Sequence, residues 1–405
     1  MPRASYLTTG SRLAPRLRNS FSTSAGTPLV TSPFLPDDIN WTLEHPTAKS
    51  AREAGSAPFM LITDEQVKLR LQDPGQQSSV LFAASGFVTG SRTIDSAEVD
   101  RAFGMPIGKL RSRAGIESLA YAADDENEIT LGAKAARQAL TAASCPAEEI
   151  DSIIATSETY HLYPSLAARL HSALGARETC GAFDVGGACL GVINALAMAQ
   201  SQIASGQART VAVVTADLHS RTLVPGRVEG EFGGLFGDGA TAFILRGGTA
   251  ATQSPTLGYR LRPFLFGCAG QYAEAVKVKG CTDGSLDVVF DGEALSRAAI
   301  TRLEKVVAAI EKLSSIPRTA VGAFATHQPN PRLLTLLAKV TGVPLETFPP
   351  IARTSGNLGS STCGAALHAA LQMFHSCPAS ARKPIFLASL GPGLIFGGTW
   401  LEATS

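Results

Sequence analysis

The sequence predicts an α/β protein built from two similar halves, and three observations support this prediction. Apolar stretches of strand length alternate with longer stretches of helix length, which is typical of a largely parallel sheet covered by helices on both faces. This alternation occurs twice, in segments of about 150 residues each, as a duplicated unit would show. Of the 405 residues, 45% are apolar and 17% are charged, a balance that favours a folded chain over a disordered one.

The chain divides into three expected segments: an N-terminal extension (1–79), a first half (80–250) and a second half (251–405). The first 36 residues carry four arginines and eleven Ser or Thr, and no acidic residue precedes Asp37. This composition resembles an organellar transit peptide, but it also fits a disordered leader or a wrongly chosen start codon. The rest of the extension is polar and contains several prolines, with one short helix expected around Asp64–Leu71.

The elements of the first half follow from apolar runs and turn residues. Runs of four to eight apolar residues bounded by turns predict strands, and longer periodic runs predict helices. The expected strands are 80–88, 152–156, 181–185, 209–216 and 240–245, and the expected helices are 127–140, 165–174 and 189–204.

The second half repeats this alternation by the same criteria. The expected strands are 320–325, 384–390 and 394–401, and the expected helices are 293–312, 331–340 and 361–374.

Composition excludes several classes of protein. Lys and Arg number 35 against 34 Asp and Glu, a formal net charge of +1 that gives no signature of nucleic-acid or anionic-membrane binding. No run of about 18 apolar residues predicts a membrane span. The seven cysteines form no CxxC pair and have no metal-ligand spacing, and GxGxxG after a strand, GxxxxGK[ST] and HExxH are all absent, so neither a metal nor a bound cofactor is expected. A soluble, intracellular enzyme fits best.

Cys189 is the first candidate for catalysis. It follows a short predicted strand and Gly186-Gly187, and it begins a strongly apolar helix. A thiol at a helix N-terminus feels the positive end of the helix dipole, which predicts a lowered pKa, and the turn supplies a backbone N–H that could bind an oxyanion. The alternative is a buried cysteine that packs as a small apolar side chain.

His327 and Asn357 are the next candidates. His327 ends an apolar strand, where open α/β sheets place ligands, although a structural histidine fits the same position. Asn357 lies in the glycine-rich turn Ser355–Ser361 before a helix, a weak signal by itself because Asn and Gly are ordinary turn residues. Asp238, in an Asp-Gly pair, is expected to be structural, and the other histidines are scattered without metal spacing.

Taken together and in this order, these residues resemble the ketoacyl-ACP synthase III family of condensing enzymes, which has the thiolase fold. The resemblance extends from about Val80 to Ala403, and any one of its blocks would be weak alone. The blocks are Ser112–Ile116, Tyr163–Ser165, Phe183–Leu190, Phe236–Ala240, His327–Asn330, Gly356-Asn357 and Gly391–Leu394.

The resemblance implies a role for each candidate. Cys189 would carry the acyl group as a thioester, and His327 and Asn357 would stabilise the enolate formed when a malonyl unit loses carbon dioxide. The Cys189 N–H and that of Gly391 or Gly393 would form the oxyanion hole, since Pro392 has no N–H.

The resemblance also implies binding residues. Arg113, Arg221 and Arg332 would face coenzyme A or the carrier protein, and Tyr163 would cross a homodimer interface and restrict the acyl pocket. Lys109 stands where the family commonly has a tryptophan, so stacking on an adenine ring is not available and acetyl-CoA is not favoured as the primer.

The expected reaction is a decarboxylative Claisen condensation of fatty-acid synthesis, which joins an acyl-CoA or another acyl thioester to malonyl-ACP. The main alternative is a thiolase-fold acyltransferase of secondary metabolism that moves the acyl group to a hydroxyl or an amine. Head-to-head condensing enzymes are disfavoured because they use a glutamate base where this chain has Tyr163. A papain-like hydrolase is disfavoured because this chain lacks the sequence context that surrounds the cysteine in that class. A non-catalytic subunit is disfavoured because Cys189, His327 and Asn357 are all present.

The remaining expectations follow from this assignment. The partners would be an acyl carrier protein and a second copy of the chain, with no nucleic acid and no membrane span. The expected localisation is cytoplasmic, or mitochondrial if the leader acts as a transit peptide.

Overall fold

The computed structural model describes residues 79–248, 257–280, 286–290 and 292–404, all within a compact unit that spans Leu61–Ser405. The expected helix at 64–71 and nearly all of the expected extension lie outside the described residues, as does the expected boundary near residue 250.

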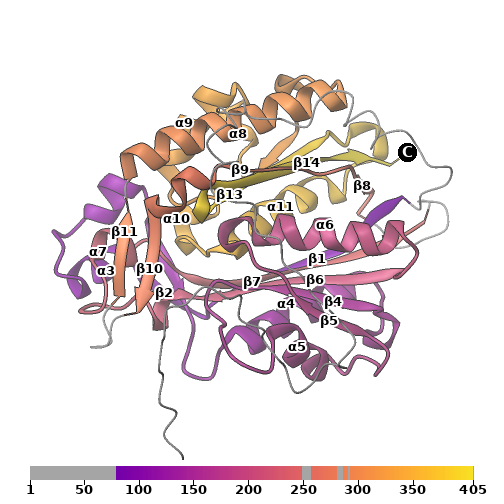
Figure 1. Ribbon diagram of the computed structural model, residues 1–405, viewed down its shortest axis with the longest axis horizontal. Coiled ribbons are helices and arrows are strands. Elements are labelled where there is room, and N and C mark those ends of the chain that lie inside the picture. Colours follow the sequence, from indigo (N-terminus) through magenta and orange to yellow (C-terminus); the bar gives the residue numbers. More distant parts are fainter. Residues whose placement is uncertain (1–78, 249–256, 281–285, 291, 405) are drawn as a thin grey trace, which may run out of the picture. The chain divides into compact units, whose positions relative to one another are not determined.

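One ten-stranded sheet runs through both halves of this unit (Figure 1). Its path is β12-β13-β14-β8-β1-β7-β6-β4-β5, and β9 pairs with β14. The strands are β1 (Val80–Thr89), β4 (Ser152–Thr156), β5 (Gly181–Asp184), β6 (Thr210–Leu218), β7 (Asp238–Gly247), β8 (Tyr259–Leu261), β9 (Leu265–Cys268), β12 (Ala323–Ala325), β13 (Ile385–Gly391) and β14 (Ile395–Ala403).

The sheet is mixed, which corrects the expectation of a largely parallel one. Parallel pairs join β6 to β4, β4 to β5 and β12 to β13, whereas the other strand pairs described in this sheet are antiparallel. Strands β13 and β14 are joined by only three residues, and strands joined by so short a turn pair antiparallel. Strands β6 and β7 also pair antiparallel, although residues 219–237 between them contain the short helix α7 (Gly230–Gly233). The alternation of strands and helices along the chain did not distinguish these connections from crossovers between parallel strands.

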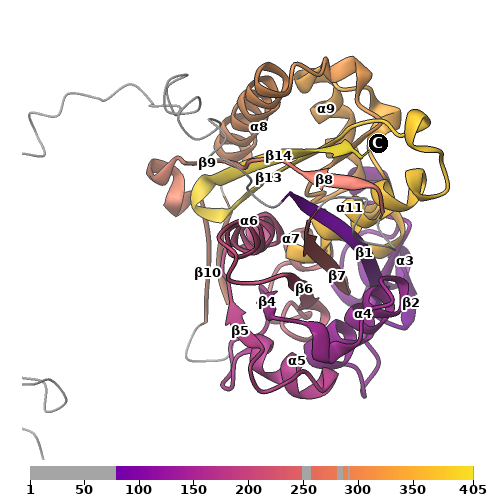
Figure 2. The same ribbon diagram turned by 90° about the vertical axis from the view of Figure 1, so that its right-hand side faces the viewer.

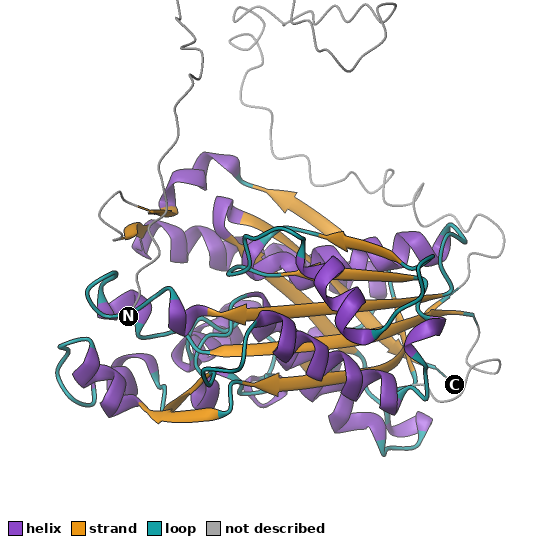
Figure 3. Ribbon diagram, turned by 90° about the horizontal axis from the view of Figure 1, so that it is seen from below, coloured by secondary structure: helices purple, strands orange, loops and turns teal. Residues whose placement is uncertain are grey.

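Helices and strands stack in five layers, as Figure 2 shows edge-on. Two central helices, α6 (Gly191–Ala204) and α11 (Ser360–His375), lie between the first-half strands and the second-half strands. Helices α4 (Glu128–Ala142) and α5 (Leu166–Leu174) cover the outer face of the first half, seen from below in Figure 3, and α8 (Gly292–Ser314) and α9 (Pro331–Thr341) cover the second. This α-β-α-β-α arrangement confirms the predicted thiolase-like fold.

Three apolar clusters correspond to these layers. One surrounds α6 and α11, one lies beneath α4 and α5, and one lies beneath α8 and α9. The central helices are rich in Ala and Gly because little space separates them from the strands: a Cβ at Gly364 would lie 2.2 Å from Thr241 Oγ1. This close approach holds the N-terminal turns of both central helices in fixed positions.

The predicted elements of the core are present, with ends that differ by one to three residues. Asn127 and Ser165, expected as the first helical residues, are instead the N-caps of α4 and α5. Smaller elements were not predicted because their apolar pattern is short. They are β2 (Arg92–Asp95), α3 (Ser96–Ala102), β3 (Ser118–Tyr121), α7 (Gly230–Gly233), β10 (Val276–Gly280), β11 (Leu286–Phe290) and α10 (Ala352–Ser355), besides β8 and β9.

In the described part of the chain, no helix combines the length and the apolar character needed to span a bilayer.

Candidate active site

Cys189 lies in a tight turn between β5 and α6, as the sequence predicts. Gly187 has φ 141° and Ala188 has φ 46°, and Leu190 N–H donates to the Gly187 carbonyl at 2.9 Å, so the chain reverses within a few residues. Gly191 then begins α6 so close to β4 that a Cβ there would lie 2.2 Å from Thr156 Oγ1. The turn therefore presents a partly exposed Cys189 at the N-terminal end of a central helix.

The glycine turn after β13 packs against the Cys189 turn. Ser389 Oγ donates to the Cys189 carbonyl at 3.0 Å, and a Cβ at Gly391 would lie 2.8 Å from the Gly187 oxygen. Gly393, with φ 79°, has no heavy atom within 4 Å of the position its Cβ would take. Of the two glycines proposed from the sequence, Gly391 is thus the one whose contacts lie at the nucleophile turn.

Asn357 is buried just before α11, with only 3% of its surface exposed. Its Oδ1 accepts from Gly359 N–H at 3.0 Å and from Thr362 Oγ1 at 3.1 Å, while its backbone bonds to Leu235 and Gly237. Because Gly359 N–H can only donate, these bonds fix the amide orientation and leave Nδ2 as the group available to a ligand.

His327 directly follows Thr326 at the end of β12 and is 6% exposed. Burial disfavours the charged imidazolium and lowers the pKa of His327 to about 4, against the opposing charge of Glu158. Its Nδ1 is buried and has no hydrogen-bond partner within the described residues. At neutral pH this histidine is therefore a neutral side chain.

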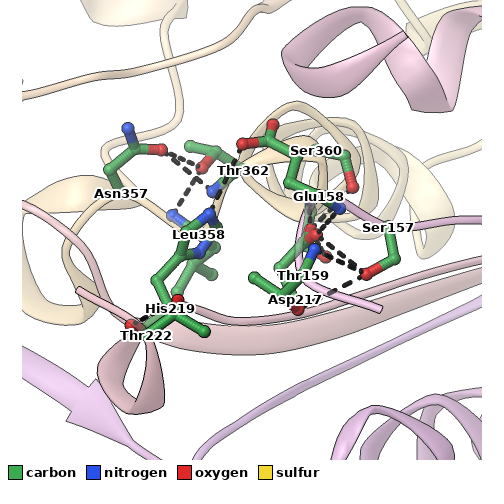
Figure 4. A network of polar contacts seen from close by, with 12 residues as sticks. Ser157, Glu158, Thr159, Asp217, His219, Thr222, Asn357, Leu358, Ser360 and Thr362 are labelled. Atoms are coloured by element: carbon green, nitrogen blue, oxygen red, sulfur yellow. Dashed lines mark hydrogen bonds and ion pairs between the residues drawn. The ribbon is translucent and has the colours of Figure 1, made fainter. Parts of the chain in front are cut away.

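Two further residues of the site, Glu158 and His219, were missed by the sequence analysis (Figure 4). Glu158 Oε2 pairs with His219 Nε2 at 3.4 Å, and the Glu158 side chain is only 15% exposed. Gly359 packs against both: a Cβ there would lie 2.5 Å from His219 Cε1 and 3.0 Å from Glu158 Cδ. His219 was grouped with the scattered histidines, and no local motif marked Glu158, although it follows a buried strand as a lone charged residue.

Asp217 anchors this group from the end of β6. Its carboxylate accepts from Glu158 N–H at 2.6 Å, from Ser360 Oγ at 2.6 Å and from Ser361 N–H at 3.0 Å. Burial and the nearby charge of Glu158 raise the pKa of Asp217 to about 6. Asp217 thereby connects β4, β6 and the N-terminus of α11.

The electrostatics of the site differ from the expectation for Cys189. Burial raises the pKa of its thiol well above the ordinary value, and the carboxylates of Glu158 and Asp217 raise it further. Burial raises the pKa of Glu158, but bonding to His219 outweighs burial and leaves it lowered. Burial likewise lowers the pKa of His219, but Glu158 outweighs burial and leaves it raised. The prediction of a lowered thiol pKa was wrong, because burial of the thiol, and then the charges of two buried carboxylates, outweigh the helix dipole.

The arginines that the sequence predicts to bind coenzyme A or the carrier protein differ in their surroundings. Arg113 and Arg332 are exposed, and they lie near each other because Gly115 packs against Pro331 and Arg332. Arg221 instead donates to the carbonyls of the 123–126 loop, including Ala123 at 2.8 Å. Lys109 forms an ion pair with Glu231.

Tyr163 is 98% exposed, in the loop before α5. Asp238, expected to be structural, is buried and accepts from Ser220 and Ala122 backbone N–H at 2.9 and 2.7 Å. Over the described ranges, no group of three or more His, Cys, Asp or Glu side chains is placed to hold a metal ion.

Comparison with known proteins places the chain in a family. Residues 183–262 match the model of 3-oxoacyl-[acyl-carrier-protein] synthase III, and residues 313–403 match the model of its C-terminal part. The beta-ketoacyl-[acyl-carrier-protein] synthase III of Rhodobacter capsulatus is 32% identical over 322 residues, which cover 78% of this chain and 97% of the relative. The enzyme of the same name from Granulibacter bethesdensis is 28% identical over 80% of this chain and 98% of the relative.

Solved structures agree with the fold. The 3-oxoacyl-(acyl carrier protein) synthase III of Pseudomonas aeruginosa superposes with a TM-score of 0.71 at 23% identity, over 81% of this chain and 99% of that one. OleA of Xanthomonas campestris superposes equally well, with a TM-score of 0.71 at 20% identity, over 80% of this chain and 99% of that one. The fold is therefore common to both enzymes. By the relative that it matches at 32% identity over nearly its full length, this chain belongs to the beta-ketoacyl-[acyl-carrier-protein] synthase III family.

Proposed function

We propose that this acyltransferase loads an acyl group from a CoA or carrier thioester onto Cys189 and then condenses it with malonyl-ACP, releasing carbon dioxide. The observation that carries the proposal is the placement of Cys189 and Asn357 at the N-terminal ends of the two central helices, α6 and α11. The turn that begins α6 contacts α11, and His327 follows the end of β12 by two residues.

In the loading step, the Cys189 sulfur attacks the thioester carbonyl and the CoA or carrier thiol leaves. The backbone N–H groups of Cys189 and Gly391 would bind the oxyanion, which the packing of the Gly391 turn on the Cys189 turn supports. Gly393 is the second candidate for this donor.

In the condensation step, Asn357 Nδ2 and a neutral His327 would donate to the malonyl thioester oxygen. As carbon dioxide leaves, the electron pair of the broken C–C bond forms an enolate, and fixed neutral donors stabilise its oxygen in a dry site. The enolate carbon then attacks the Cys189 thioester and frees the thiol. The fixed amide orientation of Asn357 and the lowered pKa of His327 support these roles.

The surface residues fit a carrier-bound substrate. Arg113 and Arg332 are exposed neighbours that would bind the phosphates of CoA or of the carrier arm, since guanidinium groups pair well with phosphate. Arg221 would act indirectly, by holding the 123–126 loop. The ion pair of Lys109 with Glu231 occupies the place of the family's tryptophan, which supports a donor other than acetyl-CoA.

The proposal also includes a homodimer, formed through the edge strand β5. Tyr163 and Phe183 are apolar side chains exposed near the edge strand β5, and Asp184 of that strand caps the first turn of α5 through Leu166 and Ala167 N–H. An edge strand with exposed aromatic neighbours is a ready pairing surface. Tyr163 would then line the acyl pocket of the second copy. No cofactor is required by this chemistry, and the cytoplasm is the proposed compartment.

Intact-mass measurement tests the proposal. After incubation with a panel of acyl-CoA donors, the wild type should carry one acyl adduct that Cys189→Ala abolishes and Cys268→Ala, at an exposed cysteine, retains. Malonyl-ACP should then discharge the adduct with release of carbon dioxide. An adduct that persists in Cys189→Ala contradicts the nucleophile, and discharge to an alcohol or amine without carbon dioxide would assign the alternative acyltransferase reaction.

A further inference from the structure

We propose that Glu158 accepts the proton of the Cys189 thiol when the acyl group is loaded, and that His219 positions Glu158 for this step. The inference rests on the proposed role of Cys189 as the nucleophile. It adds to the proposed Cys–His–Asn chemistry a proton acceptor that the family resemblance did not supply.

The first support is the position of Glu158 in the fold. It follows the end of β4 by two residues, and the end of β4 faces the first turn of α6: the Gly191 Cα lies against Thr156, with only 2.2 Å between Thr156 Oγ1 and the place a Gly191 Cβ would take. Cys189 precedes Gly191 by two residues. The two side chains are close enough that the negative charge of Glu158 adds to the effect of burial and raises the pKa of the Cys189 thiol.

The second support is the way the carboxylate is held. Oε2 pairs with His219 Nε2 at 3.4 Å, and the Glu158 backbone N–H donates to Asp217 at 2.6 Å. Oε1 is buried and has no hydrogen-bond partner within the described residues. A buried carboxylate oxygen without a hydrogen-bond partner is unfavourable, so this oxygen can gain a favourable bond by receiving a proton.

The third support is the close packing of Gly359 and Phe236 around Glu158 and His219. Gly359 has φ 58°, and any side chain there would overlap His219 and Glu158. The His219 ring lies against Phe236, with 4.6 Å between ring centroids, which restricts its rotation. The other ionisable groups that face Glu158 are Asp217 from β6, His327 from β12 and Cys189 from the turn.

The proposed step balances. The S–H bond of Cys189 breaks, the proton forms an O–H bond on Glu158, and the sulfur electron pair forms the new C–S bond to the acyl carbon. When the tetrahedral intermediate collapses, the C–S bond to the leaving thiol breaks, and the Glu158 proton passes to that thiolate. Glu158 returns to a carboxylate, and no oxidant or reductant is needed.

This proton transfer also explains how the carboxylate of Glu158 can lie beside the nucleophile Cys189. Two adjacent negative charges are unfavourable, so a free thiolate and an ionised Glu158 do not coexist readily. Proton transfer avoids that state, because the sulfur becomes charged only when Glu158 becomes neutral. Cys189 and Glu158 therefore titrate as one unit, and the resting enzyme holds Cys189 as a neutral thiol.

The test compares two measurements on Glu158→Gln, with Glu178→Gln, an exposed glutamate before β5, as the matched control. Loading from an acyl-CoA, followed by rapid quench and intact mass, should slow by about 10²- to 10⁴-fold in Glu158→Gln. Alkylation of Cys189 by iodoacetamide should shift to lower pH in the same variant, because a negative charge has been removed. A structural role alone predicts no such opposite pair of effects.

Loading at the wild-type rate or faster in Glu158→Gln would overturn the proposal. If that variant does not fold, Glu158→Asp keeps the charge but shortens the side chain by one methylene, and it should load at least about tenfold more slowly; wild-type loading would again contradict the inference. Cys189→Ala separates the two hypotheses. An adduct that survives in Cys189→Ala contradicts the proposed function, whereas normal loading in Glu158→Gln contradicts only the role of Glu158.

Discussion

His327 and Asn357 are buried side chains that are both uncharged at neutral pH. Burial lowers the pKa of His327 to about 4, and Asn357 has its Oδ1 occupied by Gly359 and Thr362. Neutral donors suit an enolate in a dry site, since a buried imidazolium would require a compensating negative charge.

The neutrality of His327 predicts a pH dependence of stability. Its folded pKa of about 4 lies below the ordinary value of 6.5, so the unfolded chain takes up the proton first as the pH falls. The contribution is fully present above the unfolded pKa, and about 2 kcal/mol of it is lost between about pH 7 and pH 5. Urea unfolding should therefore show a shallower pH dependence for His327→Gln than for the wild type. Equal slopes for both proteins would contradict a neutral His327.

Gly359 gives a second prediction at this scale. Gly359→Ala should reduce acyl loading by about 10- to 100-fold, because the new Cβ would displace Glu158 and His219. Gly226→Ala is the matched control: Gly226 also has a positive φ, 79°, but nothing lies within 4 Å of its Cβ position. Both variants place a side chain at a positive φ, and only Gly359→Ala should lose loading activity. A similar loss in both would assign the effect to strain alone.

The central helices are the elements on which the site depends. Helix α6 begins at the Cys189 turn and α11 begins at the Asn357–Gly359 turn, so the two halves of the fold each contribute one N-terminus. Asp217, from β6, reaches across to Ser360 and Ser361 in the first turn of α11. This carboxylate fixes the second half of the site against the first.

Asp217 predicts a large effect on stability. In Asp217→Asn, an amide group would face N–H and O–H donors that now reach a carboxylate, which should lower the free energy of unfolding by about 2 kcal/mol. The expected result is a melting temperature lower by several degrees. Asp95→Asn serves as the control, since Asp95 is an exposed N-cap of α3 and Asn caps helices equally well. An unchanged melting temperature for Asp217→Asn would contradict this account.

At the scale of the whole molecule, the edge strand β5 is the proposed contact between two copies. Phe183→Lys should place a charge in that contact, because Phe183 is 49% exposed on this strand. Sedimentation velocity should then show a species of half the mass, while Leu336→Lys, at a 41% exposed leucine on α9, should behave like the wild type. Dimers that persist in Phe183→Lys would move the interface elsewhere.

Local signals predicted much of the fold. Fully buried strands such as β4 and β6 are continuous apolar runs, and the helices carry caps and periodic apolar faces, so each could be recognised within its own segment. Strand direction could not be recognised in this way, because β6 and β7 pair antiparallel across a connection that contains a short helix, as a connection between parallel strands often does. The cysteine, histidine and asparagine candidates came from local context and from the family resemblance.

The sequence by itself determined the duplicated α/β architecture, the family and the three residues proposed for acyl transfer. These features depend on short-range patterns: apolar periodicity, turns rich in glycine, and motifs in a fixed order. Only the tertiary structure decided the protonation of the site. Glu158, Asp217 and His219 lie far from Cys189 in the chain or in unrelated motifs, and they act through burial and through charges a few ångströms away. Burial and distance depend on packing between elements, so no local pattern could predict that Cys189 rests as a thiol.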